Sequence, residues 1–363
     1  MTNILITGGA GFIGSNFIPY FLEKYPEYQL INLDLLTYAG DLKNLKEIEN
    51  NHNYKFIKGD ISNRELVEFI FTEYDIQGVI HFAAESHVDN SIKSPGVFIK
   101  TNVNGTFTLL DVAYKHWMDA PFKYKDKFLG TEVLTSANTL PRFHHISTDE
   151  VYGTLNETDF FTEETPYAPN SPYSASKAGS DMIVRSYQET YGMNTVITNC
   201  SNNYGPKQHD EKLIPTIIRK AFAGESIPIY GDGKNIRDWL YVLDHCKGID
   251  LVYHTSKEAN VYNIGGRNER TNLQIVDAIC NILDIKVPRP TRHPELDSGS
   301  SYKELITFVT DRAGHDRRYA IDATKLESEL AWSAHENFDS GIIKTFEWYL
   351  KKYIISDDGR NSV

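Results

Sequence analysis

The chain has 363 residues, of which 40% are hydrophobic and 24% are charged, and it carries a net charge of −12 at pH 7. This length can form one large domain, or a domain with a smaller lobe. The acidic balance argues against a nucleic-acid-binding protein, because the phosphate backbone requires a basic surface.

Membrane insertion and secretion are not expected either. No apolar run reaches the roughly 18 residues that a membrane span requires. The first residues, MTNILITGGAG, lack the basic segment and the cleavage site of a signal peptide. The three cysteines, Cys200, Cys246 and Cys280, are widely spaced and form no metal-binding motif. They suit a reducing compartment, so we expect a cytoplasmic protein.

Short apolar segments alternate with amphipathic ones along the first half of the chain. The apolar segments predict buried strands at residues 3–7, 28–34, 55–60, 78–84 and 143–148. The amphipathic segments predict helices at residues 14–25, 63–74 and 103–117. This alternation predicts an α/β fold, a Rossmann-type doubly wound parallel sheet.

The second half is more polar and richer in loops, which suits a smaller substrate lobe. We expect a nucleotide-binding domain over residues 1–203 that also carries the catalytic residues. A substrate lobe would occupy most of residues 204–350, with returns to the core, and a frayed tail residues 351–363. Residues 120–141 lack clear periodicity and are expected to form a surface excursion.

A glycine-rich turn joins the first predicted strand to the first helix. Gly8, Gly11 and Gly14 are spaced by three residues there, which permits a tight turn and close approach of backbone N–H groups to a pyrophosphate. Asp34 ends the second strand, where a carboxylate can bind adenosine ribose hydroxyls. Because this carboxylate would repel the 2′-phosphate of NADP, the sequence predicts NAD. The alternative is that Asp34 only caps a helix.

A tyrosine and a lysine follow at helical spacing. Tyr173 and Lys177 lie four residues apart in SPYSASKAG, so both side chains share one face of a helix. A nearby ammonium favours the phenolate and lowers the pKa of the tyrosine, which can then accept a proton from a substrate hydroxyl. Such pairs also occur on ordinary surface helices. After a dinucleotide-binding fold and Thr148 at a strand end, the pair indicates short-chain dehydrogenase/reductase chemistry.

Two adjacent carboxylates stand in STDEVYG, residues 147–153. A capped turn with acids in its first helical turn is one interpretation. The position of STDEVYG at the end of a predicted central strand favours a chemical role instead, because doubly wound sheets bind ligands at the carboxyl ends of their strands. Oxidation alone needs no further acid or base, so Asp149 and Glu150 indicate a second step. Oxidation of a sugar at C4 acidifies the C5 proton, and an adjacent base and acid can then eliminate water.

Over about residues 2–350 the chain resembles the dTDP-glucose 4,6-dehydratases of the extended short-chain dehydrogenase/reductase family. The resemblance rests on long motifs in the right order: TGGAGFIGSNF, LTYAGDLKNL, HFAAESHVDNSI, FHHISTDEVYG, SPYSASKAGSD, TNCSNNYGP, EKLIP, IRDWLYVLDH, YNIGGRNERTNL and DRAGHDRRYAID. It implies dehydration of dTDP-glucose with bound and recycled NAD. Tyr173 would be the base for C4 oxidation, supported by Lys177 and Thr148. Asp149 would be the acid for the C6 hydroxyl and Glu150 the base for C5.

The resemblance also implies two sets of ligand contacts. The contacts to NAD would be Gly8, Gly11, Phe12, Ile13, Gly14, Asp34, Leu35, Leu36, Thr37, Asp60, Ile61, Phe82, Ala83, Ala84, Ser86, Thr101, Tyr173, Lys177 and Asn203. The contacts to the sugar nucleotide would be Ser86, His87, Thr148, Asn202, Lys212, Leu213, Pro228, Tyr230, Arg237, Asn272, Asp311, Arg312 and His315. Relatives pair the helices after Thr101 and Tyr173 across a dimer interface, so we expect a homodimer.

Several alternatives stay open. A UDP-glucose 4,6-dehydratase, a 4-epimerase or a UDP-glucuronate decarboxylase would share the fold, and a non-catalytic NAD-sensing protein is a rival of another class. Thymine and uracil differ by one methyl group, so the sequence does not decide the base. Two departures from the family are Ala313, where DRPGH is usual, and a long segment at residues 293–301. No metal is expected, because His144 and His145 alternate across a strand.

Overall fold

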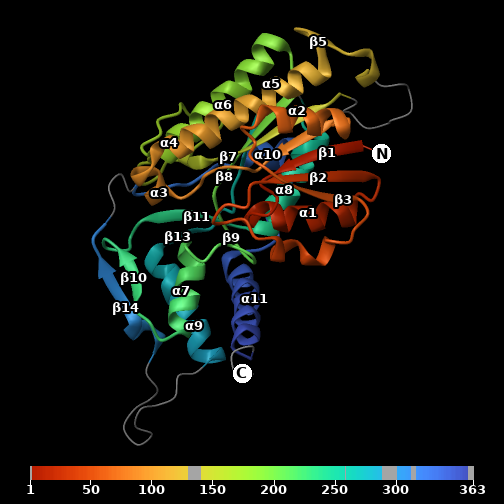
Figure 1. Ribbon diagram of the computed structural model, residues 1–363. Helices are drawn as coiled ribbons and strands as arrows, with labels where there is room; N and C mark the ends of the chain where they lie inside the picture. The colour runs from red at the N-terminus through yellow and green to blue at the C-terminus, as the bar shows by residue number, and fades with distance from the viewer. Residues whose placement is uncertain (1, 130–139, 258, 288–300, 312–315, 359–363) are drawn as a thin grey trace, which may run out of the picture.

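The centre of the fold is a parallel sheet with the strand order β12-β8-β7-β4-β1-β2-β3 (Figure 1). The computed structural model describes residues 2–129, 140–257, 259–287, 301–311 and 316–358. The strands of this sheet are β1 (Thr2–Thr7), β2 (Tyr28–Asp34), β3 (Tyr54–Lys58), β4 (Gly78–His81), β7 (Arg142–Thr148), β8 (Thr195–Cys200) and β12 (Asn260–Ile264). Winding reverses at β1, which pairs with both β2 and β4. The predicted doubly wound fold is therefore confirmed.

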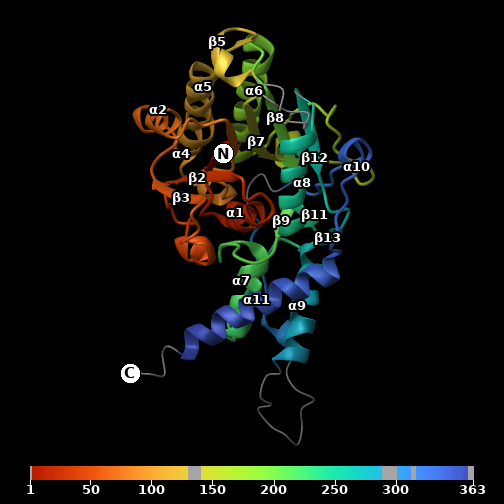
Figure 2. The same ribbon diagram turned by 90° about the vertical axis from the view of Figure 1, so that its right-hand side faces the viewer.

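Helices cover both faces of this sheet (Figures 1 and 2). One face packs against α1 (Phe12–Lys24), α8 (Val242–Thr255) and α10 (Thr324–Leu330). The other packs against α2 (Arg64–Glu73), α5 (Thr106–Trp117) and α6 (Pro172–Tyr191). The sequence predicts the first two strand–helix units within a few residues, because buried parallel strands are apolar throughout and the helices between them are amphipathic.

Short elements link β4 to α5 on the way across the sheet. They are α3 (Val88–Lys93), α4 (Pro95–Phe98) and a π-helical turn, η2 (Ile99–Gly105). The 3-10 turns η1 (Leu42–Ile48), η3 (Asp126–Phe128) and η4 (Asp149–Tyr152) follow β2, β6 (Lys123–Tyr124) and β7. Since β4, β7 and β8 are paired in parallel, their carboxyl ends meet at one edge of the sheet.

A smaller lobe follows β9 (Asn202–Tyr204) and has its own apolar core. Its helices are α7 (Leu213–Phe222), α9 (Asn272–Lys286) and α11 (Phe338–Asp358). Its strands are β10 (Ile227–Tyr230), β11 (Ile236–Tyr241), β13 (Glu269–Thr271) and β14 (Ile306–Val309), and it includes the 3-10 turn η5 (Tyr302–Leu305). Figure 2 shows this lobe below the main sheet. The chain returns from it to the core through α8 and β12.

Two segments differ from their sequence-based description. The start of the expected surface excursion is a hairpin of β5 (Met118–Ala120) and β6 (Lys123–Tyr124). It is anchored in the core, because Tyr124 is buried and its hydroxyl accepts a hydrogen bond from the Asn194 amide (2.7 Å). Residues 351–358, expected in a tail, continue α11. Residues 130–139, 293–300, 312–315 and 359–363 lie outside the described residues.

A buried arginine ties the sheet to the end of α8. Arg142, at the start of β7, is 2% exposed. It donates to the carbonyls of Val252 (3.2 Å), Tyr253 (2.8 Å) and Ser256 (2.8 Å). The last carbonyls of a helix have no partner within it, so the guanidinium supplies a donor for the Tyr253 and Ser256 carbonyls and adds one to the Val252 carbonyl, which also accepts from Ser256.

We predict that Arg142→Met lowers the free energy of unfolding by about 2–4 kcal/mol, because it removes the guanidinium donor from the Tyr253 and Ser256 carbonyls while keeping an apolar stem. Urea unfolding followed by circular dichroism measures this loss. The matched control is Arg185→Met on α6, whose exposed pair with Glu189 should contribute less than about 0.5 kcal/mol. Equal stability of the two variants would contradict the role of Arg142.

Candidate active site

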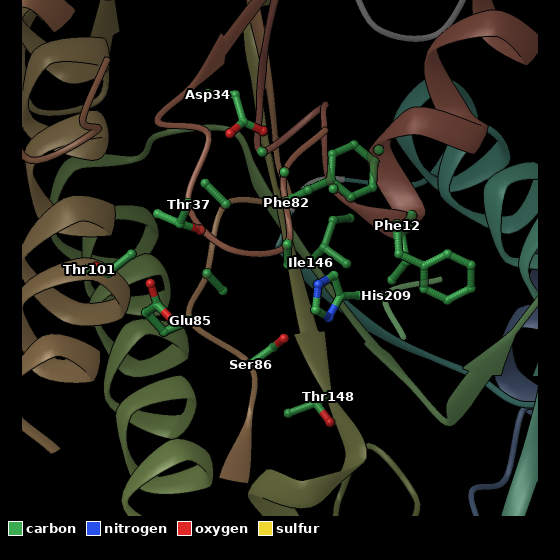
Figure 3. Close-up of a pocket in the computed structure, with 18 of the residues that line it drawn as sticks. Phe12, Asp34, Thr37, Phe82, Glu85, Ser86, Thr101, Ile146, Thr148 and His209 are labelled. Carbon is green, nitrogen blue, oxygen red and sulfur yellow. The ribbon is translucent and has the colours of Figure 1, made fainter. Parts of the chain in front are cut away.

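A cavity of about 320 Å³ opens at the carboxyl edge of the sheet, where winding reverses. Its wall is formed by the turn before α1, the ends of β2, β3, β4, β7 and β8, one face of α6, and the segment before α7. Figure 3 shows it from Asp34 at one end, past Phe82 and Ile146, to Thr148 at the other. Doubly wound folds bind ligands at this place.

The glycine turn fits a dinucleotide pyrophosphate. Gly8 has a φ of +71°, and a Cβ there would come within 2.6 Å of the Ala83 backbone. A Cβ on Gly14 would lie 2.6 Å from the Gly9 Cα. Only glycine allows the turn to pack this closely against the segment after β4 and against its own backbone. The first residues of α1 line the cavity, so their backbone N–H groups can bind a pyrophosphate there.

Asp34 has two roles in the same turn. Its Oδ2 accepts a hydrogen bond from the Ala10 amide (2.9 Å) and its Oδ1 one from the Leu36 amide (2.8 Å). Burial raises the pKa of this carboxyl, although both amides oppose the shift. Asp34 also lines the cavity, and each carboxylate oxygen can accept a second hydrogen bond. The carboxylate thus braces the glycine turn and stays available to ribose hydroxyls.

The other residues expected to contact NAD gather on the same wall, with one exception. The residues that line the cavity are Gly8, Gly11, Phe12, Ile13, Gly14, Asp34, Leu35, Thr37, Asp60, Ile61, Phe82, Ala83, Ala84, Ser86, Thr101, Tyr173, Lys177 and Asn203. Leu36 does not line it, because a φ of +56° turns its side chain toward the core beside α1. This wall has the length, the glycine cradle and the carboxylate that a dinucleotide requires.

The reactive side chains meet at the end of β7. Thr148 ends this strand, and Glu150 in η4 donates its amide to the Thr148 hydroxyl (3.3 Å). Tyr173 and Lys177 project from α6, as their spacing predicts, and both are buried. The helix starts at a capping box of Ser171 and Ser174, with Pro172 as its first residue. Thr148, Glu150, Tyr173 and Lys177 line one end of the cavity.

Burial separates the two carboxylates. Asp149 is 2% exposed, and its Oδ2 has no hydrogen-bond partner among the described residues. Burial, then the charges of Glu150 and Asp238, raise the pKa of Asp149 well above its ordinary value. Glu150 is only half-buried and faces the cavity. Such a shift favours the protonated carboxyl, which is the form that can donate a proton.

The Tyr173 phenol differs from the expectation of a lowered pKa. Burial and the Glu150 charge raise the pKa of Tyr173 well above its ordinary value, and a hydrogen bond with the Thr148 side chain opposes this. The reason is that burial in a cavity beside carboxylates disfavours a phenolate. Burial also lowers the pKa of Lys177 to about 8, while the Asp181 charge raises it.

The residues expected to hold the sugar nucleotide are only partly gathered. Ser86, Thr148, Asn202 and Lys212 line the cavity. His87 lies beside it, with its Nε2 3.7 Å from Glu211 Oε2. The structure places the remaining described positions, which do not line this cavity, in the smaller lobe: Leu213, Pro228, Tyr230, Arg237, Asn272 and Asp311. Arg312 and His315 lie outside the described residues.

Arg237 is a clear example of a side chain turned inward. It is 6% exposed, lies over the Tyr319 ring at 4.2 Å, and donates to the Asp316 carbonyl (2.9 Å). These contacts position the chain around residue 316. The positive charge of the Arg237 guanidinium also acts on Asp149, where it opposes the rise in the carboxyl pKa.

Sequence reasoning missed several residues of the cavity wall. Glu85, Gln208, His209 and Glu211 line it, and Figure 3 shows the His209 ring projecting into it. The last three come from the polar run QHDE before α7, whose only sequence signal is its position in a loop.

Asn102, which supports the cavity without lining it, was also missed. It exchanges hydrogen bonds with the Glu85 backbone (2.9 and 3.0 Å) and donates to Ser176 Oγ (2.8 Å), which fixes the end of β4 against α6.

Neither a metal-binding cluster nor a membrane span is found in the described parts of the chain. No group of three or more His, Cys, Asp or Glu side chains there could hold a metal ion. None of the helices described combines the length and apolar character of a membrane span.

Comparisons with known proteins agree with this architecture. The family described as GDP-mannose 4,6 dehydratase matches residues 5–345. A dTDP-glucose 4,6-dehydratase from Xanthomonas campestris pv. campestris is 50% identical over 350 residues, covering 96% of this chain and 93% of that protein. The crystal structure of a dTDP-glucose 4,6-dehydratase from Bacillus anthracis in complex with NAD is 45% identical, with a TM-score of 0.80 and 97% of each chain covered. That of the Streptomyces venezuelae enzyme, with NAD and TYD bound, is 39% identical, with a TM-score of 0.83 and 96% and 97% covered.

We predict that the protein binds NADP more weakly than NAD by about 1.5–3 kcal/mol, roughly 10- to 150-fold, because the 2′-phosphate would meet the buried Asp34 carboxylate. Calorimetric titration of cofactor-stripped protein measures both affinities. Asp34→Asn keeps the size of the side chain and one hydrogen-bond acceptor but removes the charge, so it should reduce the ratio of the NAD affinity to the NADP affinity. Equal affinities of the unaltered protein for the two cofactors would mean that Asp34 serves only the glycine turn.

Proposed function

The chain belongs to the dTDP-glucose 4,6-dehydratases within the GDP-mannose 4,6 dehydratase family, and we propose how its residues convert dTDP-glucose to dTDP-4-keto-6-deoxyglucose. The reaction is a hydro-lyase reaction: oxidation at C4, loss of water across C5 and C6, and return of hydride at C6 with a proton at C5. One observation carries this proposal. A buried Asp149, whose carboxyl pKa is raised by that burial, and a cavity-facing Glu150 lie beside the Tyr173, Lys177 and Thr148 group.

NAD is the cofactor of this reaction, and when bound it accepts hydrogen from C4 and returns it at C6. The residues that fit it are the glycine turn, Asp34 and the strand ends that line the cavity. Ile146 and Phe82 supply apolar wall between these polar groups (Figure 3). Apolar wall of this kind reduces contact between water and the reacting carbons.

Tyr173 Oη is the group that takes the C4 hydroxyl proton. The hydrogen bond with Thr148 lowers its pKa, and Lys177 lies one helical turn away on the same helix, where its ammonium is to support the phenolate. The Lys177 Nζ is fixed by the Ile146 carbonyl (2.8 Å), so its charge stays at one place. Burial of all three side chains strengthens these interactions, because the dielectric is low there.

Glu150 and Asp149 divide the elimination between them. Glu150 removes the C5 proton, which the C4 ketone has made acidic, and it does so from the cavity wall. Asp149 protonates the leaving C6 hydroxyl, since burial holds it as an acid. A single proton donor and a single acceptor are what loss of water requires.

The rival reactions account for this site less well. A 4-epimerase needs oxidation and reduction but no adjacent acid and base. A decarboxylase must recognise a C6 carboxylate, and Glu85, Glu150 and Glu211 give this cavity an acidic wall. An NAD-sensing protein has no use for the Tyr173 and Lys177 pair. The choice between thymine and uracil is tested by comparing turnover of dTDP-glucose with that of UDP-glucose.

We predict that Tyr173→Phe and Glu150→Gln block different steps. Tyr173→Phe removes the base that acts on the C4 hydroxyl, so the rates at which reduced cofactor and product form should both fall by about 10²–10⁴-fold. Glu150→Gln keeps Tyr173, Lys177 and Thr148, so C4 is still oxidised, and the 4-keto sugar should accumulate with reduced cofactor. Single-turnover absorbance at the reduced nicotinamide band separates the two variants.

Asp149→Asn is the matched partner of Glu150→Gln, since an amide cannot protonate the leaving hydroxide. It should retain oxidation and lose elimination by a similar factor of about 10²–10⁴. Deuterium uptake at C5 from heavy water then distinguishes the pair, because only Glu150→Gln should lose it. Exchange at the unaltered rate in Glu150→Gln would overturn the role of Glu150.

We further propose that the protein is a homodimer and works in the cytoplasm. Phe107 on α5 and Met182 on α6 are 43% and 49% exposed, and these two helices pack side by side. Exposed apolar side chains of this size on adjacent helices suit an interface. Its three cysteines are unpaired, as in a reducing compartment.

We predict that sedimentation equilibrium at micromolar concentration shows a dimer, and that Met182→Glu dissociates it, because a charge would be buried at the interface. Phe69→Glu is the matched control, since Phe69 is 55% exposed on α2. A monomer in the unaltered protein would contradict this assembly.

A further inference from the structure

Lys177 belongs to a buried ionic cluster between β7 and α6. Its Nζ lies 3.3 Å from His145 Nε2, and the same Nε2 lies 3.1 Å from Asp181 Oδ1. Asp181 follows Lys177 by four residues on α6, so one face of the helix carries both. Asp181 is 1% exposed and Lys177 3%, which leaves this pair of charges away from water.

Asp181 is the main negative charge acting on Lys177. His145 is neutral, since burial and the nearby lysine hold its pKa well below its ordinary value. The Cys200 thiol is neutral as well, because burial raises its pKa to about 12. Among the neighbours that favour the Lys177 ammonium, Asp181 has the largest effect and opposes the burial that lowers the lysine pKa to about 8.

The Asp181 carboxylate is held in place by other groups. Ser147 Oγ donates to its Oδ2 (2.8 Å), and the Tyr167 side chain hydrogen-bonds to it. Burial raises the pKa of Asp181 to about 6, while Lys177 and these hydrogen bonds lower it. The carboxylate is therefore mostly ionised at neutral pH, although it is enclosed by protein.

We propose that Asp181 is a positioning residue of the reaction, whose carboxylate keeps Lys177 an ammonium so that Lys177 can support the Tyr173 phenolate. The inference rests on the proposed function of Tyr173 and Lys177. It assigns to a second buried carboxylate, remote from the sugar site, the task of maintaining the lysine charge in a low-dielectric pocket.

The pH dependence follows from the groups that face Asp181. These are His145 and Ser147 from β7, Lys177 from α6, Tyr167, and Tyr152 of η4. His145 stays neutral, and burial raises the pKa of both tyrosines, so they stay neutral too. Asp181 and Lys177 are thus the two groups that change charge between about pH 6 and about pH 8.

Removing the Asp181 charge should lower the pKa of Lys177. The lysine would then lose its proton at lower pH, and the active combination of phenolate and ammonium would decline earlier on the alkaline side. Below about pH 6 the unaltered Asp181 is itself neutral, so the variant and the unaltered protein should behave alike there. The effect of the substitution therefore grows with pH.

The experiment compares Asp181→Asn with the unaltered holoenzyme. Lysine labelled with carbon-13 at the ε position reports the Lys177 titration by NMR, and Lys177→Arg assigns its signal. We expect the midpoint in Asp181→Asn to fall by one unit or more. A fall of one unit lowers the single-turnover rate of C4 oxidation about tenfold at about pH 9, with rates converging near about pH 6. Tyr167→Phe, which keeps the charge, should leave the lysine midpoint in place, and Asp181→Glu should restore it.

The outcomes are distinct. An unchanged lysine midpoint, or an equal loss of rate at every pH, would show that Asp181 only supports packing and would overturn the proposal. Should Asp181→Asn not fold, the unaltered protein decides, since its Lys177 signal must show a second inflection near the Asp181 titration. The NMR result does not depend on turnover, so a failure of the proposed function, seen as no reaction of the unaltered protein with dTDP-glucose, is recognised separately.

Discussion

Burial of ionisable groups at the end of β7 is the constraint on which the site depends. Asp149, Tyr173, Lys177 and Asp181 are each at most 8% exposed, and for each of them the loss of water is the largest influence on the pKa. In this medium a charge must be matched by a partner within a few ångströms, since solvent does not screen it. The ionisable side chains of α6 and of the segment after β7 therefore influence one another's pKa values.

The scaffold exists to keep these groups enclosed and in register. Parallel pairing brings Ser147 and Thr148 level with Asn199 and Cys200, and α6 lies across them with its capped first turn next to the cavity. Asn102 fixes the strand end after β4 to α6 from the other side. The glycine turn belongs to the same edge because β1 is central, so cofactor and acid–base groups share one cavity.

The fold of the first half could be predicted from the sequence, because each buried strand and each amphipathic helix has a local periodicity. Tyr173 and Lys177 could be paired for the same reason, since a helix converts spacing into proximity. The path of the loops could not be predicted, because loops have no periodic pattern of apolar residues. His209 and Glu211 reach the cavity wall from a polar run with no local signal, and Arg237 turns inward onto Tyr319 only because the lobe folds back around residue 316.

The long-range returns of the chain were also beyond a local analysis. β12 joins the main sheet beside β8 although a lobe separates them along the chain, and that pairing is decided by packing over α8. Similarly, α11 runs past residue 350 because Tyr349 and Tyr353 pack on the lobe core and Lys352 pairs with Asp210 (3.2 Å). Neither partner of these contacts is near in sequence.

The adjacency of Asp149 and Glu150 now has a physical explanation. Two neighbouring carboxylates would repel each other if both were ionised, and in the low dielectric at the end of β7 that repulsion is large. Burial on one side of η4 resolves it by raising the Asp149 pKa, and the Glu150 charge adds to the same shift. Both effects favour the protonated form of Asp149. A base and an acid can thus arise from two like residues, because one is buried and the other faces the cavity, and their proximity adds to the difference.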